Sequence, residues 1–330
     1  MKHKKNRIQK AGGGALLLLL ILCGFLALFL GSAKLTPSDF WAGLTHPETT
    51  EGIILYHLRL PRILGAVLAG AGLSLAGMLL QTVTGNDLAG PNIIGVNAGA
   101  GFAAILTLSL APTAVLLLPV SAFAGAFLTT LLIVGIASRM GRSKATVILA
   151  GVAVTALLNA GISLLSLLDT DVLASYNHFS IGGLAGVTLK ELPLPALLIF
   201  ACLALSLLLA KRMEALTLGD AIAASLGIRV KPFRIFCLVL ASASAAAAVS
   251  FAGLLGFVGL IVPHMARRMV KGLRLQLMYS ALLGGILVLV ADLLGRVLIA
   301  PSEIPVGILL AALGAPFFFY LLVRRNAHEI

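Results

Sequence analysis

The sequence predicts an all-α, polytopic membrane protein with about ten transmembrane helices. Hydrophobic residues make up 60% of the 330 residues and charged residues only 11%, whereas about 25% of the residues of an ordinary globular protein are charged. The apolar stretches are long, and they lack the alternation of apolar and polar residues that marks the strands of a β-barrel. Because backbone polar groups have to be paired within lipid, we expect these stretches to be helices.

The predicted spans approach the roughly 20 mostly apolar residues that a transmembrane helix needs. They lie at residues 11–33, 60–83, 92–111, 114–138, 145–168, 192–210, 233–253, 255–266, 277–299 and 304–323. The eighth stretch is short, so a full crossing of the bilayer is left open there. We expect the spans to form a single transmembrane domain over residues 1–330.

The first stretch has two interpretations. Five basic residues precede an apolar run that ends at Gly31, Ser32 and Ala33, which is a pattern found in secretory signal peptides. The run is long, however, and many further spans follow it, which favours a retained first helix.

The net charge of +12 is explained by topology. If the N-terminus is cytoplasmic, most Lys and Arg residues fall in cytoplasmic segments, as the positive-inside rule describes. These segments are the N-terminus, 139–144, 211–234, 267–274 and the C-terminal Arg324 and Arg325. We therefore expect no nucleic-acid partner. Both termini are expected in the cytoplasm because the number of spans is even.

Motifs for nucleotide binding, catalysis or metal binding are absent from the sequence. The chain contains no G-x-x-x-x-G-K-[ST] phosphate loop and no H-E-x-x-H pattern. Cys23, Cys202 and Cys237 lie in different apolar stretches, as small buried residues do. His264 has no second metal ligand near it in the sequence. We therefore expect the chain to be no enzyme and to have no catalytic, cofactor or metal site.

Asp292 is the best candidate for an acidic residue within the membrane. Ionisable residues at such positions are rare and commonly functional. Arg296 follows four residues later, on the same helical face, where the two side chains can pair. A structural ion pair is favoured over a proton relay. The relay, and with it an ion-coupled secondary transporter, remains a remoter alternative.

The loop 211–232 combines apolar and charged residues, and Gly219 and Gly227 interrupt it. This pattern predicts two short amphipathic helices with a break between them. Such a loop can dock a cytoplasmic partner, or it can lie in the lipid interface. The residues alone do not separate these two interpretations.

Arg59 and Arg62 flank Pro61 at the start of the second span, on the outer face. Proline suits a helix N-terminus, but arginines are less expected there, because this end of a helix favours anions. They either anchor the chain to lipid headgroups or accept an acidic partner outside the membrane. Arg296 reaches the same face from another span.

Four sequence blocks carry a resemblance that covers residues 15–325. They are LRLPRILGAVLAGAGLSLAGMLLQ at 58–81, GFVGLIVPHMARR at 256–268, ADLLGR at 291–296 and EIPVGILLAALGAPFFFYLL at 303–322. In these blocks the chain resembles the FecCD-type permeases, which import ferric siderophores, haem and vitamin B12. The block ALTLGDAIAASLG at 215–227 resembles the coupling segment of that family.

This resemblance implies a type II ABC importer permease in the bacterial cytoplasmic (plasma or inner) membrane. The implied activity is translocation of ferric-siderophore-type iron chelates by ATP-driven alternating access, with haem or cobalamin as the alternative cargo. The implied partners are two ATPase subunits that use ATP and Mg, an extracytoplasmic substrate-binding protein, a second permease that is identical or similar, and membrane lipid. The chain itself is expected to bind no cofactor.

The resemblance also implies two sites. Arg59, Arg62 and Arg296 resemble the arginines that pair with acidic residues of the binding protein, an arrangement that sets orientation and register. The residues implied to couple the chain to the ATPase are Glu214, Leu216, Leu218, Gly219, Asp220, Ala223, Leu226 and Gly227.

Two loops depart from the family pattern. The family usually has Arg-Asn-Pro-Leu-Ala after the second span, where this chain has Gly85, Asn86 and Asp87 followed by Leu-Ala. The stretch FSIGGLAG at 179–186 lacks the Trp and Ser that the family often has outside the fifth span.

Overall fold

The computed structural model describes residues 2–31, 36–139 and 144–326. Every regular element in these ranges is a helix, which confirms the all-α prediction. Each predicted span corresponds to one long or moderately long helix. These helices are α1 (Lys2–Phe29), α4 (Leu60–Thr84), α5 (Val96–Leu110), α6 (Leu118–Arg139), α7 (Lys144–Leu168), α9 (Pro193–Thr217), α11 (Val230–Ala252), α12 (Val258–Met269), α13 (Leu273–Val297) and α14 (Val306–Asn326).

The spans differ in length. Within the described ranges, 7 helical segments are long and apolar enough to cross a membrane. α5 and the apolar part of α14 are shorter. α12 has only 12 residues, in agreement with the short eighth stretch of the sequence. The chain is therefore a multi-pass membrane protein whose shorter helices lie among longer ones.

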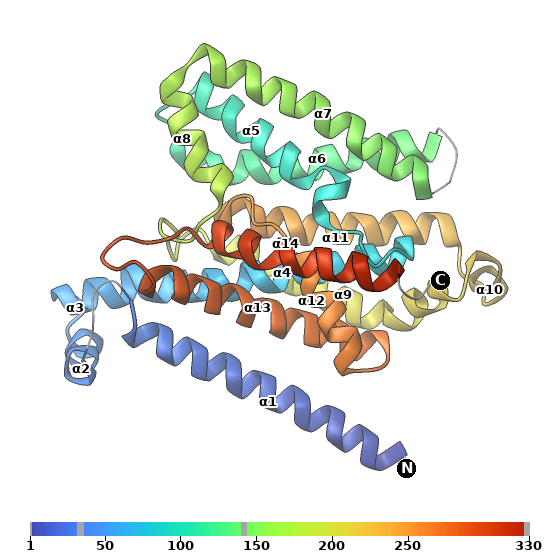
Figure 1. The fold of residues 1–330 in the computed structure, drawn as a ribbon, viewed down its shortest axis with the longest axis horizontal. Coiled ribbons are helices and arrows are strands. Elements are labelled where there is room, and N and C mark those ends of the chain that lie inside the picture. Colours follow the sequence, from blue (N-terminus) through green and yellow to red (C-terminus); the bar gives the residue numbers. More distant parts are fainter. Residues whose placement is uncertain (1, 32–35, 140–143, 327–330) are drawn as a thin grey trace.

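Short helices mark the two ends of the bundle. They are α2 (Pro37–Thr45), α3 (Thr50–Ile53), the π-helical turn η1 (Ile54–Arg59), the 3₁₀ turns η2 (Pro91–Ile94) and η3 (Val115–Leu117), α8 (Thr170–Ile181) and α10 (Asp220–Ser225). Figure 1 places α2 and α3 at one end and α10 at the opposite end, together with the start of α1 and the end of α14.

α4 lies at the centre of the arrangement, where it packs against α11, α12 and α13. In Figure 1, α5, α6, α7 and α8 form a second layer on one side, which meets the first mainly where α6 packs against α11. α1 runs along the other side, against α13. α4 and α11 are consequently mostly buried, whereas α1 and α7 are mostly exposed in the single chain.

Glycines let α4 approach its neighbours closely. A Cβ atom at Gly70 would lie 2.0 Å from the carbonyl oxygen of Gly284 in α13. A Cβ atom at Gly77 would lie 1.8 Å from the carbonyl oxygen of Gly259 in α12. Small residues at such crossings allow backbones to pack directly on one another, which stabilises helix pairs in membranes.

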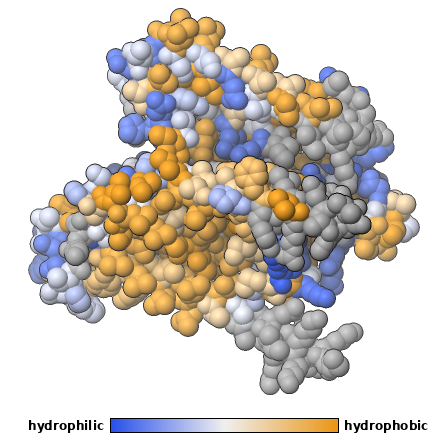
Figure 2. Space-filling view, in the orientation of Figure 1, coloured by the Kyte–Doolittle hydropathy of each residue, from blue (hydrophilic) through white to orange (hydrophobic). Residues whose placement is uncertain are grey.

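The surface separates into apolar and polar zones. Figure 2 shows hydrophobic residues over the middle of one face and hydrophilic residues toward its two ends. Soluble monomers rarely expose such large apolar areas. A membrane accounts for this surface, because lipid covers the apolar middle and water meets the ends.

Candidate functional site

The segment 211–232 contains one separate short helix rather than the two that we predicted. α9 continues to Thr217, because good helix formers fill the chain as far as Gly219 and no helix breaker precedes it. α10 then follows over Asp220–Ser225. Gly219 and Gly227 have φ values of 109° and 80°. Glycine adopts such values readily, so these two residues delimit α10.

α10 and its flanks present an apolar ridge. Leu218, Ile222 and Leu226 are 61%, 49% and 63% exposed. Leu216 and Ala223 are buried and hold the segment against the bundle. An apolar ridge on a short element that projects beyond the spans is suited to contact with another protein.

An ion pair ties α10 to the start of α11. Arg234 donates a hydrogen bond from Nη2 to Oδ1 of Asp220 over 2.7 Å. α11 is a mostly buried span, so this ion pair links the short exposed helix to the interior of the bundle. Sequence reasoning selected Asp220 but missed Arg234, since the two lie 14 positions apart and no helical spacing links them.

A polar cavity of about 400 Å³ lies beneath α10, between the end of α4 and the start of α13. Its lining includes Gln81, Asp87, Glu214, Arg234 and Arg267. Asp87 forms an ion pair with Arg267 of α12 at the edge of this cavity. The departure of residues 85–87 from the family pattern therefore gives the loop after α4 a charged contact within the chain.

A second polar cluster lies at the opposite end, where α4 meets α13. Arg62 donates hydrogen bonds from Nε to Oδ1 of Asp292 (2.8 Å) and from Nη1 to Oε2 of Glu303 (2.7 Å). Nε of Arg296 lies 3.1 Å from Oδ2 of Asp292. Glu303 was not predicted from the sequence, since it is 241 positions away from Arg62.

The three arginines predicted to dock a binding protein are all buried in this chain. Arg59, Arg62 and Arg296 are 4%, 9% and 3% exposed. Arg59 donates a hydrogen bond to the carbonyl oxygen of Leu28, and Arg296 donates one to that of Ala27, so both contact the end of α1. Carboxylates of another protein would reach these guanidinium groups only if the contacts within the chain opened.

The described residues contain no group of three or more His, Cys, Asp or Glu side chains that could hold a metal ion. Cys202 and Cys237 are buried, Cys23 is partly buried, and all three are free thiols. Ion pairs of the described residues lie instead in the two polar clusters, at opposite ends of the bundle.

The FecCD transport family matches residues 19–324, almost the whole chain. The chain belongs to this family. The match includes α10, its apolar ridge and both polar clusters.

Two relatives with similar sequences are permease proteins of bacterial transport systems. The Fe(3+)-citrate import system permease protein YfmE of Bacillus subtilis is 36% identical over 325 residues, which cover 97% of this chain and 97% of the relative. The hemin transport system permease protein HmuU of Yersinia pestis is 35% identical over 323 residues, which cover 95% of each chain.

A solved structure shares the fold. It is described as an inward-facing conformation of a metal-chelate type ABC transporter, and it superposes with a TM-score of 0.84 at 30% sequence identity. The superposition covers 96% of this chain and 99% of that chain. The FecCD architecture therefore extends over the whole bundle.

Proposed function

We propose that this FecCD chain is the transmembrane permease subunit of an ATP-binding-cassette importer that carries ferric-siderophore-type iron chelates. The observation that carries the proposal is full-length similarity to a Fe(3+)-citrate permease, at 36% identity over 97% of both chains. Cargo would pass through without covalent change while the spans alternate between two arrangements.

The energy would come from separate ATPase subunits that bind ATP and Mg, because the chain has no phosphate loop. The coupling segment Glu214–Gly227 is the proposed contact. Its exposed ridge of Leu218, Ile222 and Leu226 supports docking, and the ion pair between Asp220 and Arg234 supports transmission of the movement to α11.

The end with α10 would face the cytoplasm of a bacterial cell, with both chain termini on that side. The basic residues of the loops at that end support this orientation. The opposite end would receive an extracytoplasmic binding protein. Docking on Arg62 and Arg296 would require acidic residues that compete with Asp292 and Glu303 for these guanidinium groups. Docking on Arg59 would require its contact with the carbonyl oxygen of Leu28 to open.

A second permease, identical or similar, would complete the pathway. α7 supports this arrangement, because only 6% of its apolar window is buried in the single chain. Lipid would cover the remaining apolar surface.

Haem is the second candidate cargo, and similarity to the hemin permease HmuU favours it. Cobalamin stays a third candidate, on the family resemblance alone. We would measure uptake of radioactive ferric citrate, ferric hydroxamates, haem and cobalamin in cells that lack only this gene. Loss of uptake of one iron compound, restored by the gene, is expected. Unchanged uptake across the panel in cells without any second FecCD permease would overturn the proposal.

A further inference from the structure

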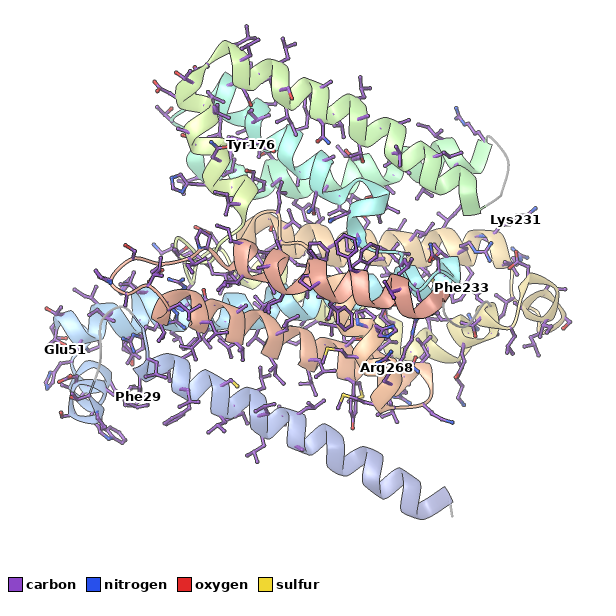
Figure 3. All side chains as sticks on the ribbon, in the orientation of Figure 1. Phe29, Glu51, Tyr176, Lys231, Phe233 and Arg268 are labelled. Carbon is purple, nitrogen blue, oxygen red and sulfur yellow. The ribbon has the colours of Figure 1, made fainter. Side chains whose placement is uncertain are left out.

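A second concave site lies beside α10, lined by other residues than the polar cavity. It is a groove of about 600 Å³ between the last turns of α9 and the first turn of α11. Figure 3 labels Phe233, one of its lining residues, and the adjacent Lys231. The lining residues are Lys211, Arg212, Ala215, Leu226, Gly227, Ile228, Arg229, Pro232 and Phe233.

The groove carries positive charge that the described part of the chain does not neutralise. Lys211, Arg212 and Arg229 are exposed, and no acidic residue lines the groove. The nearby Arg234 and Arg267, by contrast, each have an aspartate partner. The first turn of α11 also begins here without a side-chain cap, and the N-terminus of a helix favours an anion. The groove therefore fits a negatively charged group.

The same groove continues into an apolar surface. Ile228, Pro232 and Phe233 supply apolar lining. Leu208 lies one turn before Arg212 on α9 and is 77% exposed, and Phe236 lies one turn after Pro232 on α11 and is 40% exposed. A ligand that fits both parts has an anionic head and an apolar tail.

We infer that this groove binds an anionic phospholipid. Lys211, Arg212 and Arg229 would hold the phosphate of the headgroup, and an acyl chain would lie along Leu208 and Phe236. Basic pockets between spans at the cytoplasmic boundary are suited to such headgroups. The inference rests on the membrane orientation proposed above and does not depend on the cargo. Ala215, Leu226 and Gly227 belong both to the groove and to the coupling segment, so the lipid would lie directly beside the proposed ATPase contact.

The test uses the purified full-length chain in detergent, titrated with phosphatidylglycerol or phosphatidylcholine and observed by native mass spectrometry. Replacement of Lys211, Arg212 and Arg229 by glutamine should weaken phosphatidylglycerol binding by about fivefold for each base removed. The matched control replaces Arg268, Lys271 and Arg274 by glutamine. These three bases are also exposed at the α10 end, and the net charge changes equally, so the control should retain the lipid.

A second variant separates charge from folding. Arg212→Lys combined with Arg229→Lys preserves the charge of the groove and should retain most of the phosphatidylglycerol. Three results would each overturn the inference: equal binding of phosphatidylcholine, equal loss of lipid in the two triple variants, or complete displacement of the lipid by an equimolar amount of inorganic phosphate. Binding of an ATPase subunit that is lost only in the groove variant, without lipid selectivity, would assign the groove to a protein partner instead.

Discussion

Arg62 and Asp292, which lie 230 positions apart in the sequence, meet in a buried ion pair with Nε and Oδ1 2.8 Å apart. The pair joins α4 to α13, and Glu303 and Arg296 extend it into a cluster of two acids and two arginines. The carboxylate of Asp292 and the guanidinium groups of Arg62 and Arg296 offset one another's charges, which lipid could not solvate.

Asp292→Asn should destabilise the protein strongly. It would leave Arg62 and Arg296 buried beside a neutral side chain, and loss of one partner of a buried ion pair costs about 3–5 kcal/mol. The free energy of unfolding in mixed micelles, measured by titration with a denaturing detergent, checks this. Asp171→Asn, at an exposed position in α8, is the control and should change little. Equal stability of the two variants would contradict a structural role for the cluster.

Gly77→Ala should disrupt the crossing of α4 and α12. The added Cβ atom would lie 1.8 Å from a backbone carbonyl oxygen, which no side-chain rotation can relieve. Overpacking usually lowers the free energy of unfolding by about 1–3 kcal/mol. We expect a loss near the upper end of this range, because the added atom meets the backbone rather than a movable side chain. Gly14→Ala in α1 meets nothing within 4 Å and is the matched control. The melting temperature in detergent distinguishes the two, and the same value for both would mean that the crossing can readjust.

The spacing of residues predicted local features of the fold and missed the long-range ones. Apolar runs located the spans because each run alone satisfies the length of a membrane helix. The four-residue interval between Asp292 and Arg296 indicated their proximity because both lie on one helix. The contact of Glu303 with Arg62 had no such signal, since it depends on how α13 and α4 pack. The length of α9 was underestimated because charged helix formers extend it beyond its apolar part.

Leu218→Ser combined with Leu226→Ser should weaken binding of the ATPase subunit to the chain. Burial of one leucine contributes about 1.5–3 kcal/mol, so each substitution should lower the affinity by roughly tenfold or more. Affinity is measured between the purified permease and its ATPase in detergent. Ala221→Ser combined with Ala224→Ser changes two exposed residues of α10 outside the ridge and should preserve binding. A loss of affinity confined to the alanine variant would show that the partner contacts another side of α10.

The ion pair between Asp87 and Arg267 should contribute little to stability. The side chain of Asp87 is 69% exposed, and exposed ion pairs typically contribute about 0–1 kcal/mol. A double-mutant cycle with Asp87→Asn and Arg267→Gln measures the coupling, which should shrink further at high salt because ions screen exposed charges. The corresponding cycle for Arg62 and Asp292 should give a larger coupling that salt hardly changes. The reverse order of the two couplings would refute the distinction between the two clusters.

Acid should loosen α2 before it affects the bundle. Hydrogen bonds from Thr36, first from its side chain and then from its backbone N–H, lower the pKa of Asp39 in a capping box at the start of α2. Because the folded-state pKa is depressed, this contribution to stability is complete above the ordinary pKa of aspartate. It is lost as the pH falls through the lower, folded-state value.

Trp41, the only tryptophan of the chain, lies in α2 and reports this change by fluorescence. Its emission in the detergent-solubilised protein should stay constant from neutral pH down to about pH 4 and shift only below it. Asp39→Asn should abolish that transition, and Asp171→Asn should retain it. If the transition persisted unchanged in Asp39→Asn, another acid would be responsible, because an amide at position 39 has no proton to gain in this range.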